Sequence, residues 1–476
     1  MATFPEEKPK RYIWLRFLIP VAIGLAIWFS PAPAGVSPNG WHLLSIFVGT
    51  IVGIMAQPLP MGAVAMIGIA LCALTGTLSI GDSLSGFANS TIWLIVAAFM
   101  FARGFIKTGL GSRIAYLFVA AFGKRSLGLG YSLVATDFVL SPAMPSNTAR
   151  AGGVILPILL SIARAYGSDP ENGTARKIGA FLIKTEYQGT NITSAMFLTA
   201  MAANPLAAKL AGDLGVQLTW GSWAIAAIVP GLASLLVIPW MLYKIYPPEI
   251  KETPGAVQLA KDKLREMGPM KTVEWIMLGV FILILTMWIG GTYFKLDATT
   301  AALVGVAVLL LTNVLGWEDV EKERKAWDTL IWFAALVMMA TFLAKLGVIP
   351  WFSKTMGGVV EGWGWVPAFL VLALAYFYSH YFFASNTAHV SAMYAPFLAV
   401  SIAAGTPPLL AALVLAFFSS LFSSMTHYGT GPAPVLYGPG YVELGTWWGL
   451  GFLVSVVNIV IWVGLGGLWW KVLGLW

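Results

Sequence analysis

Two short polar stretches, Ser146-Asn147-Thr148-Ala149-Arg150 and Ser385-Asn386-Thr387-Ala388-His389, decide the architecture of this chain. They are near-copies, 239 residues apart, in a chain of 476 residues of which 58% are hydrophobic. Inside a bilayer every hydroxyl and amide needs a hydrogen-bond partner, so such stretches are costly there. Two copies at matching places in two halves of the chain indicate one site that both halves build together.

The composition is that of a polytopic membrane protein. Charged residues make up 10% of the chain, whereas an ordinary soluble protein has about 25%. The net charge of +7 does not indicate nucleic-acid binding, because the basic residues lie between apolar runs, where lysine and arginine fix topology. The lipid bilayer is therefore the expected partner. Cys72 is the single cysteine, so no disulfide framework or thiolate metal site is expected.

Apolar runs of roughly 17–25 residues predict helices that cross the bilayer. They lie near 12–30, 41–58, 61–79, 91–107, 177–204, 221–245, 273–292, 298–316, 329–347, 408–434 and 446–470. Two more apolar segments, 127–165 (hairpin 1) and 364–404 (hairpin 2), are interrupted at their centres by the polar stretches and are predicted to be re-entrant. The expected fold is an all-α polytopic membrane protein with about 11 transmembrane helices and two re-entrant hairpins.

Residue matches at a nearly constant spacing indicate an internal duplication. The spacing drifts from 237 to 240 along the pairs Gly68/Gly305, Thr91/Thr329, Lys107/Lys345, Gly109/Gly347, Pro157/Pro396 and Gly189-Thr190/Gly429-Thr430. An ordered series of this kind is not explained by chance. The chain is therefore divided into an N-terminal segment with the first helix (1–40), repeat 1 (41–245), a linker (246–272) and repeat 2 (273–476).

Each repeat is expected to hold five crossings and one hairpin, and an odd number of crossings makes the two repeats face opposite ways. Basic residues between the apolar runs, and the lysine-rich linker, place the N-terminus in the cytoplasm and the C-terminus outside. Lys8, Lys10 and Arg11 precede the first apolar run. The linker is expected to form an interfacial amphipathic helix; it is too short for a regulatory domain with a core of its own.

The two Ser-Asn-Thr motifs are the main candidates for a substrate site. Broken helices in inverted repeats place helix termini near the middle of the membrane, and helix N-termini favour carboxylates. Serine, asparagine and threonine add neutral donors, which permit release as well as binding. Serine, asparagine and threonine are also preferred helix N-caps, so a capping role is the simpler alternative. The expected substrate-binding residues are Ser146, Asn147, Thr148, Ser385, Asn386 and Thr387.

The paired Gly-Thr segments, Gly189-Thr190 and Gly429-Thr430, follow each motif by some 43 residues. Glycine weakens a helix, and Pro432 and Pro434 follow the second pair. Their matched placement predicts unwound segments that face the hairpin tips and bind substrate. A packing kink is the alternative.

Arg150 and His389 follow the motifs at equivalent positions and are predicted to replace a coupling cation. A cation within a membrane is a candidate for function by default. An equally open alternative is that Arg150 is structural and pairs with Asp137 or Glu186. His380 and His427 are open between core and interfacial roles.

Signatures of enzymes and ATP-driven pumps are missing from the sequence. It contains no HExxH, P-loop or GxSxG motif and no acidic pair with metal-binding spacing. Neither catalysis, a cofactor nor a bound metal is expected. Secondary transport is the remaining interpretation. An anion channel is the alternative function from a different class of membrane protein.

The two motifs resemble those of the divalent anion/sodium symporter family of di- and tricarboxylate carriers, across nearly the whole chain. Ser146–Gly153 and the stretch 425–432 are similar to the branch of bacterial citrate/succinate antiporters and plastid 2-oxoglutarate/malate translocators. The resemblance implies a homodimer, an elevator motion of a transport domain against a scaffold, and carboxylate binding by the two motifs. It also implies that sodium-coupled members hold sodium at the hairpin tips and the Gly-Thr segments.

Arg150 and His389 depart from the pattern expected of sodium-coupled members. The predicted function is therefore sodium-independent antiport of C4–C5 dicarboxylates (2-oxoglutarate, malate, succinate, fumarate) in a bacterial-type inner membrane. A sodium-coupled di- or tricarboxylate symporter of the same fold is the alternative.

Overall fold

The computed structural model describes residues 13–294, 296–357 and 362–476. Within these ranges the chain is helical, with one isolated β-bridge between Arg125 and Glu252 and no strand. Lys8, Lys10 and Arg11, which precede the first predicted helix, lie outside the described residues.

The first half of the chain forms the helices of repeat 1 and the helix before it. They are α1 Ile13–Trp28, α2 Pro38–Ala56, α3 Met61–Leu74, α4 Ile80–Leu84, α5 Ser90–Thr108, α6 Leu110–Phe122, α7 Ser126–Leu140, a π-helical segment η3 Ala149–Ile155, α8 Leu156–Ala165, α9 Gly179–Met196, α10 Ala203–Asp213 and α11 Trp220–Ile245. The amphipathic helix expected in the linker is α12 Pro254–Met267, which packs against α6 and α8.

Repeat 2 follows the order of repeat 1, with a few additional short elements. They are α13 Thr272–Ile289, α14 Gly291–Phe294, α15 Ala298–Leu311, α16 Trp317–Glu321, α17 Arg324–Lys345, α18 Val348–Gly357, α19 Trp365–Ser379, α20 Asn386–His389, a π-helical segment η7 Val390–Tyr394, α21 Ala395–Ala403, α22 Pro408–Leu421, α23 Pro432–Tyr437, α24 Leu444–Val460, η9 Ile461–Gly466 and α25 Gly467–Val472. The correspondence includes the π-helical segment that follows each Ser-Asn-Thr motif.

Seven helices among the described residues are long and apolar enough to cross a membrane, by length and composition. Shorter apolar helices such as α3, α7 and α15 accompany them. The short helices α6 and α18, which occupy matching places before the two hairpins, were not expected from the sequence. The fold is the all-helical, inverted-repeat architecture that the duplication predicted.

Local sequence signals end and start the matched helices in the same way. α5 ends at Gly109, with φ of 79°, and α17 is followed by Gly347, with φ of 90°; glycine adopts this left-handed region without strain. Pro157 and Pro396 each lie at the second residue of α8 and α21, where the π-helical segments η3 and η7 pass into α-helix; proline supplies no N–H to the hydrogen-bond ladder there. Matching glycines and prolines therefore mark the same helix boundaries in both repeats.

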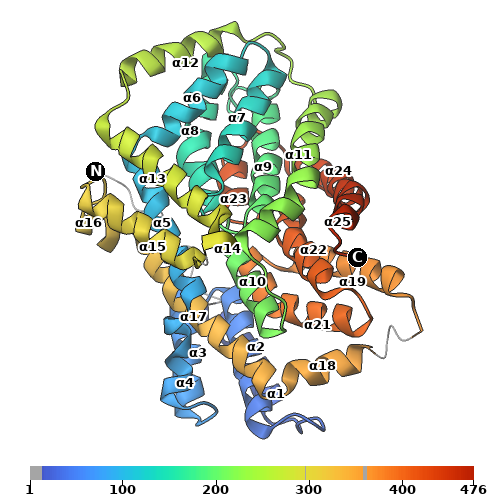
Figure 1. The fold of residues 1–476 in the computed structure, drawn as a ribbon. Helices are drawn as coiled ribbons and strands as arrows, with labels where there is room; N and C mark the ends of the chain where they lie inside the picture. Colours follow the sequence, from blue (N-terminus) through green and yellow to red (C-terminus); the bar gives the residue numbers. More distant parts are fainter. Residues whose placement is uncertain (1–12, 295, 358–361) are drawn as a thin grey trace.

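The two hairpins enter the molecule from opposite ends (Figure 1). Hairpin 1 (α7, η3 and α8) lies at the end marked by α12 and α6, while hairpin 2 (α19 to α21) lies toward the end marked by α18. Their tips meet near the centre, beside α9, α10 and α22. The long buried helix α9 packs directly on α22.

The expectation that repeat 1 unwinds at Gly189 and Thr190 is wrong. Both residues lie inside the continuous helix α9, whose residues are all buried. The helix breaks at 197–202 instead, and the matching break in repeat 2 is 425–431. The connection from hairpin to helix has 13 residues in repeat 1 (166–178) and four in repeat 2 (404–407). The spacing between the repeats therefore falls from 239, between the starts of α8 and α21, to 229, between the starts of α9 and α22. The Gly-Thr match at 240 is a coincidence.

Candidate functional site

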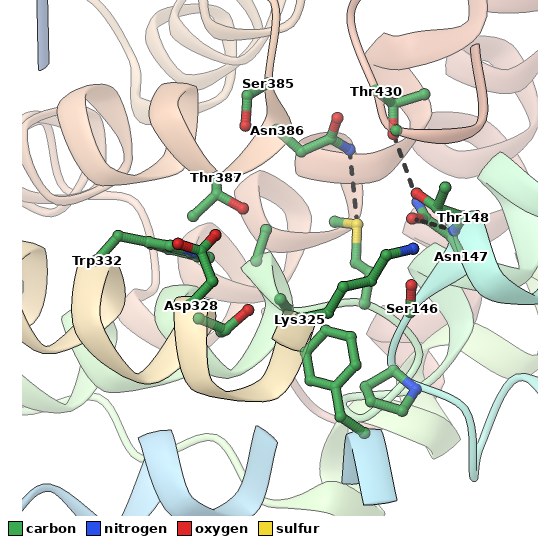
Figure 2. A pocket seen from close by; sticks show the side chains of 17 residues that line it. Ser146, Asn147, Thr148, Lys325, Asp328, Trp332, Ser385, Asn386, Thr387 and Thr430 are labelled. Carbon is green, nitrogen blue, oxygen red and sulfur yellow. Dashed lines mark hydrogen bonds between the residues drawn. The ribbon is translucent and has the colours of Figure 1, made fainter. Parts of the chain in front are cut away.

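The tips of both hairpins and both helix breaks line one cavity of about 310 Å³. Its lining comprises Ser146, Asn147 and Thr148 from hairpin 1, Ser385, Asn386 and Thr387 from hairpin 2, Met201 and Ala202 from the first break, Thr430 and Gly431 from the second, and Phe99, Pro145, Ala203, Lys325, Asp328, Thr329 and Trp332. The two motifs, 239 positions apart in sequence, are thus brought together at one cavity (Figure 2).

The motif serines cap the helices that follow them. Ser146 Oγ accepts a hydrogen bond from the Ala149 N–H at 3.1 Å, and Ser385 Oγ accepts one from the Ala388 N–H at 3.4 Å. The capping role and the cavity-lining role therefore coexist, because a helix capped at its first turn also directs its other N–H groups into the cavity.

The motif asparagines reach across to the break of the opposite repeat. Asn147 Nδ2 donates to Thr430 Oγ1 at 3.4 Å, and Asn386 Nδ2 lies 3.5 Å from Met201 Sδ. Met201 and Thr430 occupy equivalent positions at the spacing of 229 that holds after the hairpins. The contacts obey the internal symmetry, so the structure joins each hairpin tip to the other half of the chain.

Gly189 and Thr190 do not line the cavity, whereas Thr430 does. A Cβ on Gly189 would lie 2.6 Å from Val134 Cγ2, so this glycine allows α9 to pack closely against α7. Gly429 lies in the second break, and its carbonyl is 2.9 Å from His380 Nε2. Gly189-Thr190 therefore serves helix packing, whereas Gly429-Thr430 contributes to the site.

Arg150 is fully buried and binds Asp137, with 3.0 Å between Nε and Oδ1. Its Nη1 donates to the carbonyls of Met144 and Ala200, both at 2.5 Å, and Nη2 donates to Ser194 Oγ at 2.9 Å. The guanidinium thereby links hairpin 1 to the break at 197–202. It does not line the cavity, and the ion pair that was the alternative for this residue is present.

His389 is buried in an aromatic cluster beside hairpin 2. Its ring lies 4.7 Å from that of Tyr376 and 4.6 Å from those of Phe383 and Phe422, and its Nε2 is 3.0 Å from Ser379 Oγ. Like Arg150 it lies behind the tip and not in the cavity. His380, and not His389, contacts the carbonyl of the second break.

Glu186 is not the partner of Arg150. It is fully buried, and neither carboxylate oxygen has a hydrogen-bond partner among the described residues. Asp137 forms the ion pair with Arg150 and also accepts a hydrogen bond from Thr193 Oγ1.

The contribution of α17 to the cavity was not predicted from the sequence. Lys325, Asp328, Thr329 and Trp332 all line the cavity from this helix. The apolar pattern predicts a crossing that begins near residue 329, which leaves the charged run 318–328 as a connection between helices. Positions 325, 328, 329 and 332 share one helical face, and this spacing is the signal that could have revealed them.

Residues 11–476 match the family model described as the sodium:sulfate symporter transmembrane region. The chain is 64% identical over 460 residues to a Bacillus subtilis protein named "Putative malate transporter YflS", covering 96% of each. It is 55% identical over 462 residues to the chloroplastic dicarboxylate transporter 1 of Spinacia oleracea, covering 96% of this chain and 81% of that protein. It is 41% identical over 476 residues to the inner membrane protein YbhI of Escherichia coli, covering 98% of this chain and 99% of that protein.

The fold is also similar to a solved structure. The crystal structure of the Alcanivorax borkumensis YdaH transporter aligns over 97% of both chains with a TM-score of 0.51 and 12% sequence identity. At that identity the likeness concerns the fold alone.

Proposed function

The chain belongs to the sodium:sulfate symporter family, and on this premise we propose that it exchanges C4–C5 dicarboxylates across the membrane without sodium. The substrate class follows from relatives named for dicarboxylates and malate and from the donors in the cavity. The proposed substrates are 2-oxoglutarate, malate, succinate and fumarate. The two hairpin tips present neutral hydroxyl, amide and backbone N–H donors, which bind carboxylates without holding them too tightly for release.

The observation that carries the sodium independence is the position of Arg150. Its guanidinium is surrounded by the carbonyls of Met144 and Ala200, the Ser194 hydroxyl and the Asp137 carboxylate. Oxygen ligands from a hairpin tip and a helix break are the kind that would hold a small cation. Because the guanidinium is a cation that belongs to the protein itself, this place does not need a sodium ion from solution.

Repeat 2 supports the same proposal with different chemistry. His389, at the position equivalent to Arg150, lies behind the tip of hairpin 2, and His380 contacts the Gly429 carbonyl of the second break. We propose that the two imidazoles together fill the second place where a coupling ion would bind.

A carrier whose cations are fixed relies on the substrate alone to complete its binding site. We propose that the unloaded site crosses slowly, so that transport is obligatory exchange. The movement is proposed to be an elevator motion in which the hairpins, with α9 to α11 and α22 to α25, slide against a scaffold that contains α2, α3, α5 and α17. A homodimer with a cytoplasmic N-terminus and an external C-terminus is proposed on the same grounds.

Counterflow in proteoliposomes tests this function. Vesicles that contain unlabelled succinate or malate are given labelled 2-oxoglutarate outside, with sodium or with choline as the only added cation. We expect uptake in both media, and no uptake into vesicles without internal dicarboxylate.

Uptake that requires a sodium gradient and no internal anion would favour the sodium-coupled symporter that the family's name suggests. Conductance that is independent of a counter-substrate would identify an anion channel. Either result overturns obligatory exchange.

A further inference from the structure

Two charged side chains of α17, Lys325 and Asp328, line the substrate cavity. They are one helical turn apart and exposed. In Figure 2 the lysine extends toward Ser146 and Asn147, while the carboxylate points toward Thr387. Neither side chain takes part in an ion pair among the described residues, although α17 is flanked by pairs such as Lys107–Asp319 and Lys322–Glu318. The lysine can therefore bind an anionic ligand in the cavity.

The carboxylate of Asp328 lies beside the first turn of α3. A Cβ on Gly62 would lie 2.5 Å from Asp328 Oδ1, so the absence of a side chain at this position makes room for the carboxylate. Gly62 is in the first turn of α3, whose N-cap Pro60 offers no side-chain cap, and a helix N-terminus favours a negative charge. Asp328 thus lies at the side of the cavity next to α3, while Lys325 faces the tip of hairpin 1.

The other repeat has no such pair. At the spacing of 238 that relates Thr329 to Thr91, Asp328 corresponds to Ser90 and Lys325 to Phe87. At the spacing of 237 that relates Gly305 to Gly68, Thr299 corresponds to Gly62; its hydroxyl donates to the Ser90 carbonyl at 3.0 Å. The positions of repeat 1 that are equivalent to Lys325 and Asp328 therefore carry no charge.

We propose that Lys325 binds a substrate carboxylate at the tip of hairpin 1 in this conformation only, and that the two faces of the carrier therefore differ in substrate affinity. This inference rests on the proposed exchange function, because α17 stays in place when the hairpins move. At the other end of the movement the cavity meets the start of α5 and the residues before it, where Phe87 cannot replace an ammonium group. Asp328, a like charge, weakens the binding of a dianion at the same end.

The affinity at each face of the membrane tests the proposal. Right-side-out and inverted membrane vesicles loaded with saturating malate are used to measure the half-saturation concentration for labelled malate exchange. From the orientation proposed above, α17 begins at the cytoplasmic side, so inverted vesicles expose the affected face. We expect Lys325→Gln to raise half-saturation about fivefold in inverted vesicles and less than about twofold in right-side-out vesicles.

Three further variants make the result specific. Asp328→Asn should lower half-saturation about threefold in inverted vesicles, opposite in sign to the lysine variant. Lys322→Gln is the matched control, because Lys322 pairs with Glu318 on α16 and does not line the cavity. It should leave both orientations unchanged, and Lys325→Arg should retain most of the wild-type affinity.

An equal change in both orientations, or no change in either, would overturn the inference while wild-type exchange leaves the proposed function intact. Failure of the wild-type protein to exchange malate would instead refute the proposed function. A change in half-saturation confined to right-side-out vesicles would also overturn the inference, because the affected face is expected to be the one that inverted vesicles expose. Size-exclusion profiles of the purified variants separate misfolding from altered affinity.

Discussion

Asn147 on the tip of hairpin 1 and Thr430 in the break of repeat 2 lie side by side, with 3.4 Å between Nδ2 and Oγ1. The symmetry-related contact joins Asn386 to Met201. Because each tip touches the break of the other repeat, a carboxylate bound at either tip would meet groups from both halves of the chain. The site therefore depends on the relative position of the repeats, and not on either motif alone.

Replacing Thr430 by valine tests this cross-repeat contact. Thr430 is 3% exposed and lines the cavity, and the substitution keeps the shape of its side chain but removes the hydroxyl. Loss of one hydrogen bond of about 1 kcal/mol should raise half-saturation for dicarboxylate about fivefold in counterflow. Thr430→Ser keeps the hydroxyl and should retain wild-type affinity. Equal affinities of the valine variant and the wild type would contradict a substrate role for this hydroxyl.

The ion pair between Arg150 and Asp137 should be essential for stability when one partner alone is removed. Arg150→Ala leaves a buried carboxylate unpaired, and the free energy of unfolding should fall by about 3–5 kcal/mol. Thermal unfolding in detergent measures the change. Lysine is not an adequate replacement, since its single ammonium cannot reproduce the planar set of donors that meets four acceptors.

A double replacement separates stability from function at this site. Arg150→Met with Asp137→Leu removes both charges and should recover much of the lost stability but abolish exchange, because the attached cation is gone. Arg113 and Glu274 form a second low-exposure pair, with 2.6 Å between Nε and Oε1, away from the cavity. Arg113→Met with Glu274→Leu is the matched control and should retain exchange. Undiminished exchange in the first double variant would refute the role proposed for Arg150.

His380→Phe should weaken substrate binding with little effect on folding. Phenylalanine keeps the ring that stacks on Phe422 at 3.7 Å, but the Gly429 carbonyl loses its partner in the second break. We expect half-saturation to rise about threefold to tenfold, from a hydrogen bond of roughly 1 kcal/mol. His42, which stacks on Trp28 at 3.8 Å outside the site, supplies the control His42→Phe. Similar effects of the two variants would show that ring packing alone matters.

The repeat-matched glycine Gly305 should tolerate no side chain. A Cβ there would lie 2.3 Å from Phe101 Cζ and 2.4 Å from Ile284 Cδ1, so Gly305→Ala should lower stability by about 1–3 kcal/mol. Gly279 in α13 has nothing within 4 Å of the place that a Cβ would occupy. Gly279→Ala is therefore expected to be neutral or stabilising by up to about 1 kcal/mol. Apparent melting temperatures of the two variants in the same detergent decide between these outcomes.

The sequence was sufficient to predict the inverted duplication and the meeting of the two Ser-Asn-Thr motifs. Helix-ending glycines and first-turn prolines keep their spacing in both repeats, so local signals identified the duplication. The sequence was insufficient to pair the two repeats after the hairpins, because the longer connection 166–178 shifts the spacing from 239 to 229. Gly189-Thr190 was consequently paired with the wrong segment. A chance match of two small residues cannot reveal which helix is continuous.

The contribution of α17 escaped prediction for a different physical reason. Lys325 and Asp328 are polar residues near a helix end, where charges are common at a membrane boundary. Whether such residues can reach a ligand depends on whether the helix end faces lipid headgroups, bulk water or a cavity, and that is decided by tertiary packing. The close approach of Asp328 to Gly62 joins residues 266 positions apart and leaves no local trace in the sequence.

The guanidinium of Arg150 also limits how the cavity can open. Through this one side chain Met144 and Asp137 of hairpin 1 are joined to Ser194 of α9 and Ala200 of the adjoining break. A hairpin fastened at its tip by several buried hydrogen bonds cannot swing aside as a gate. Spin labels on α8 and α9 should therefore keep one separation throughout the transport cycle, while labels on α8 and α17 change theirs.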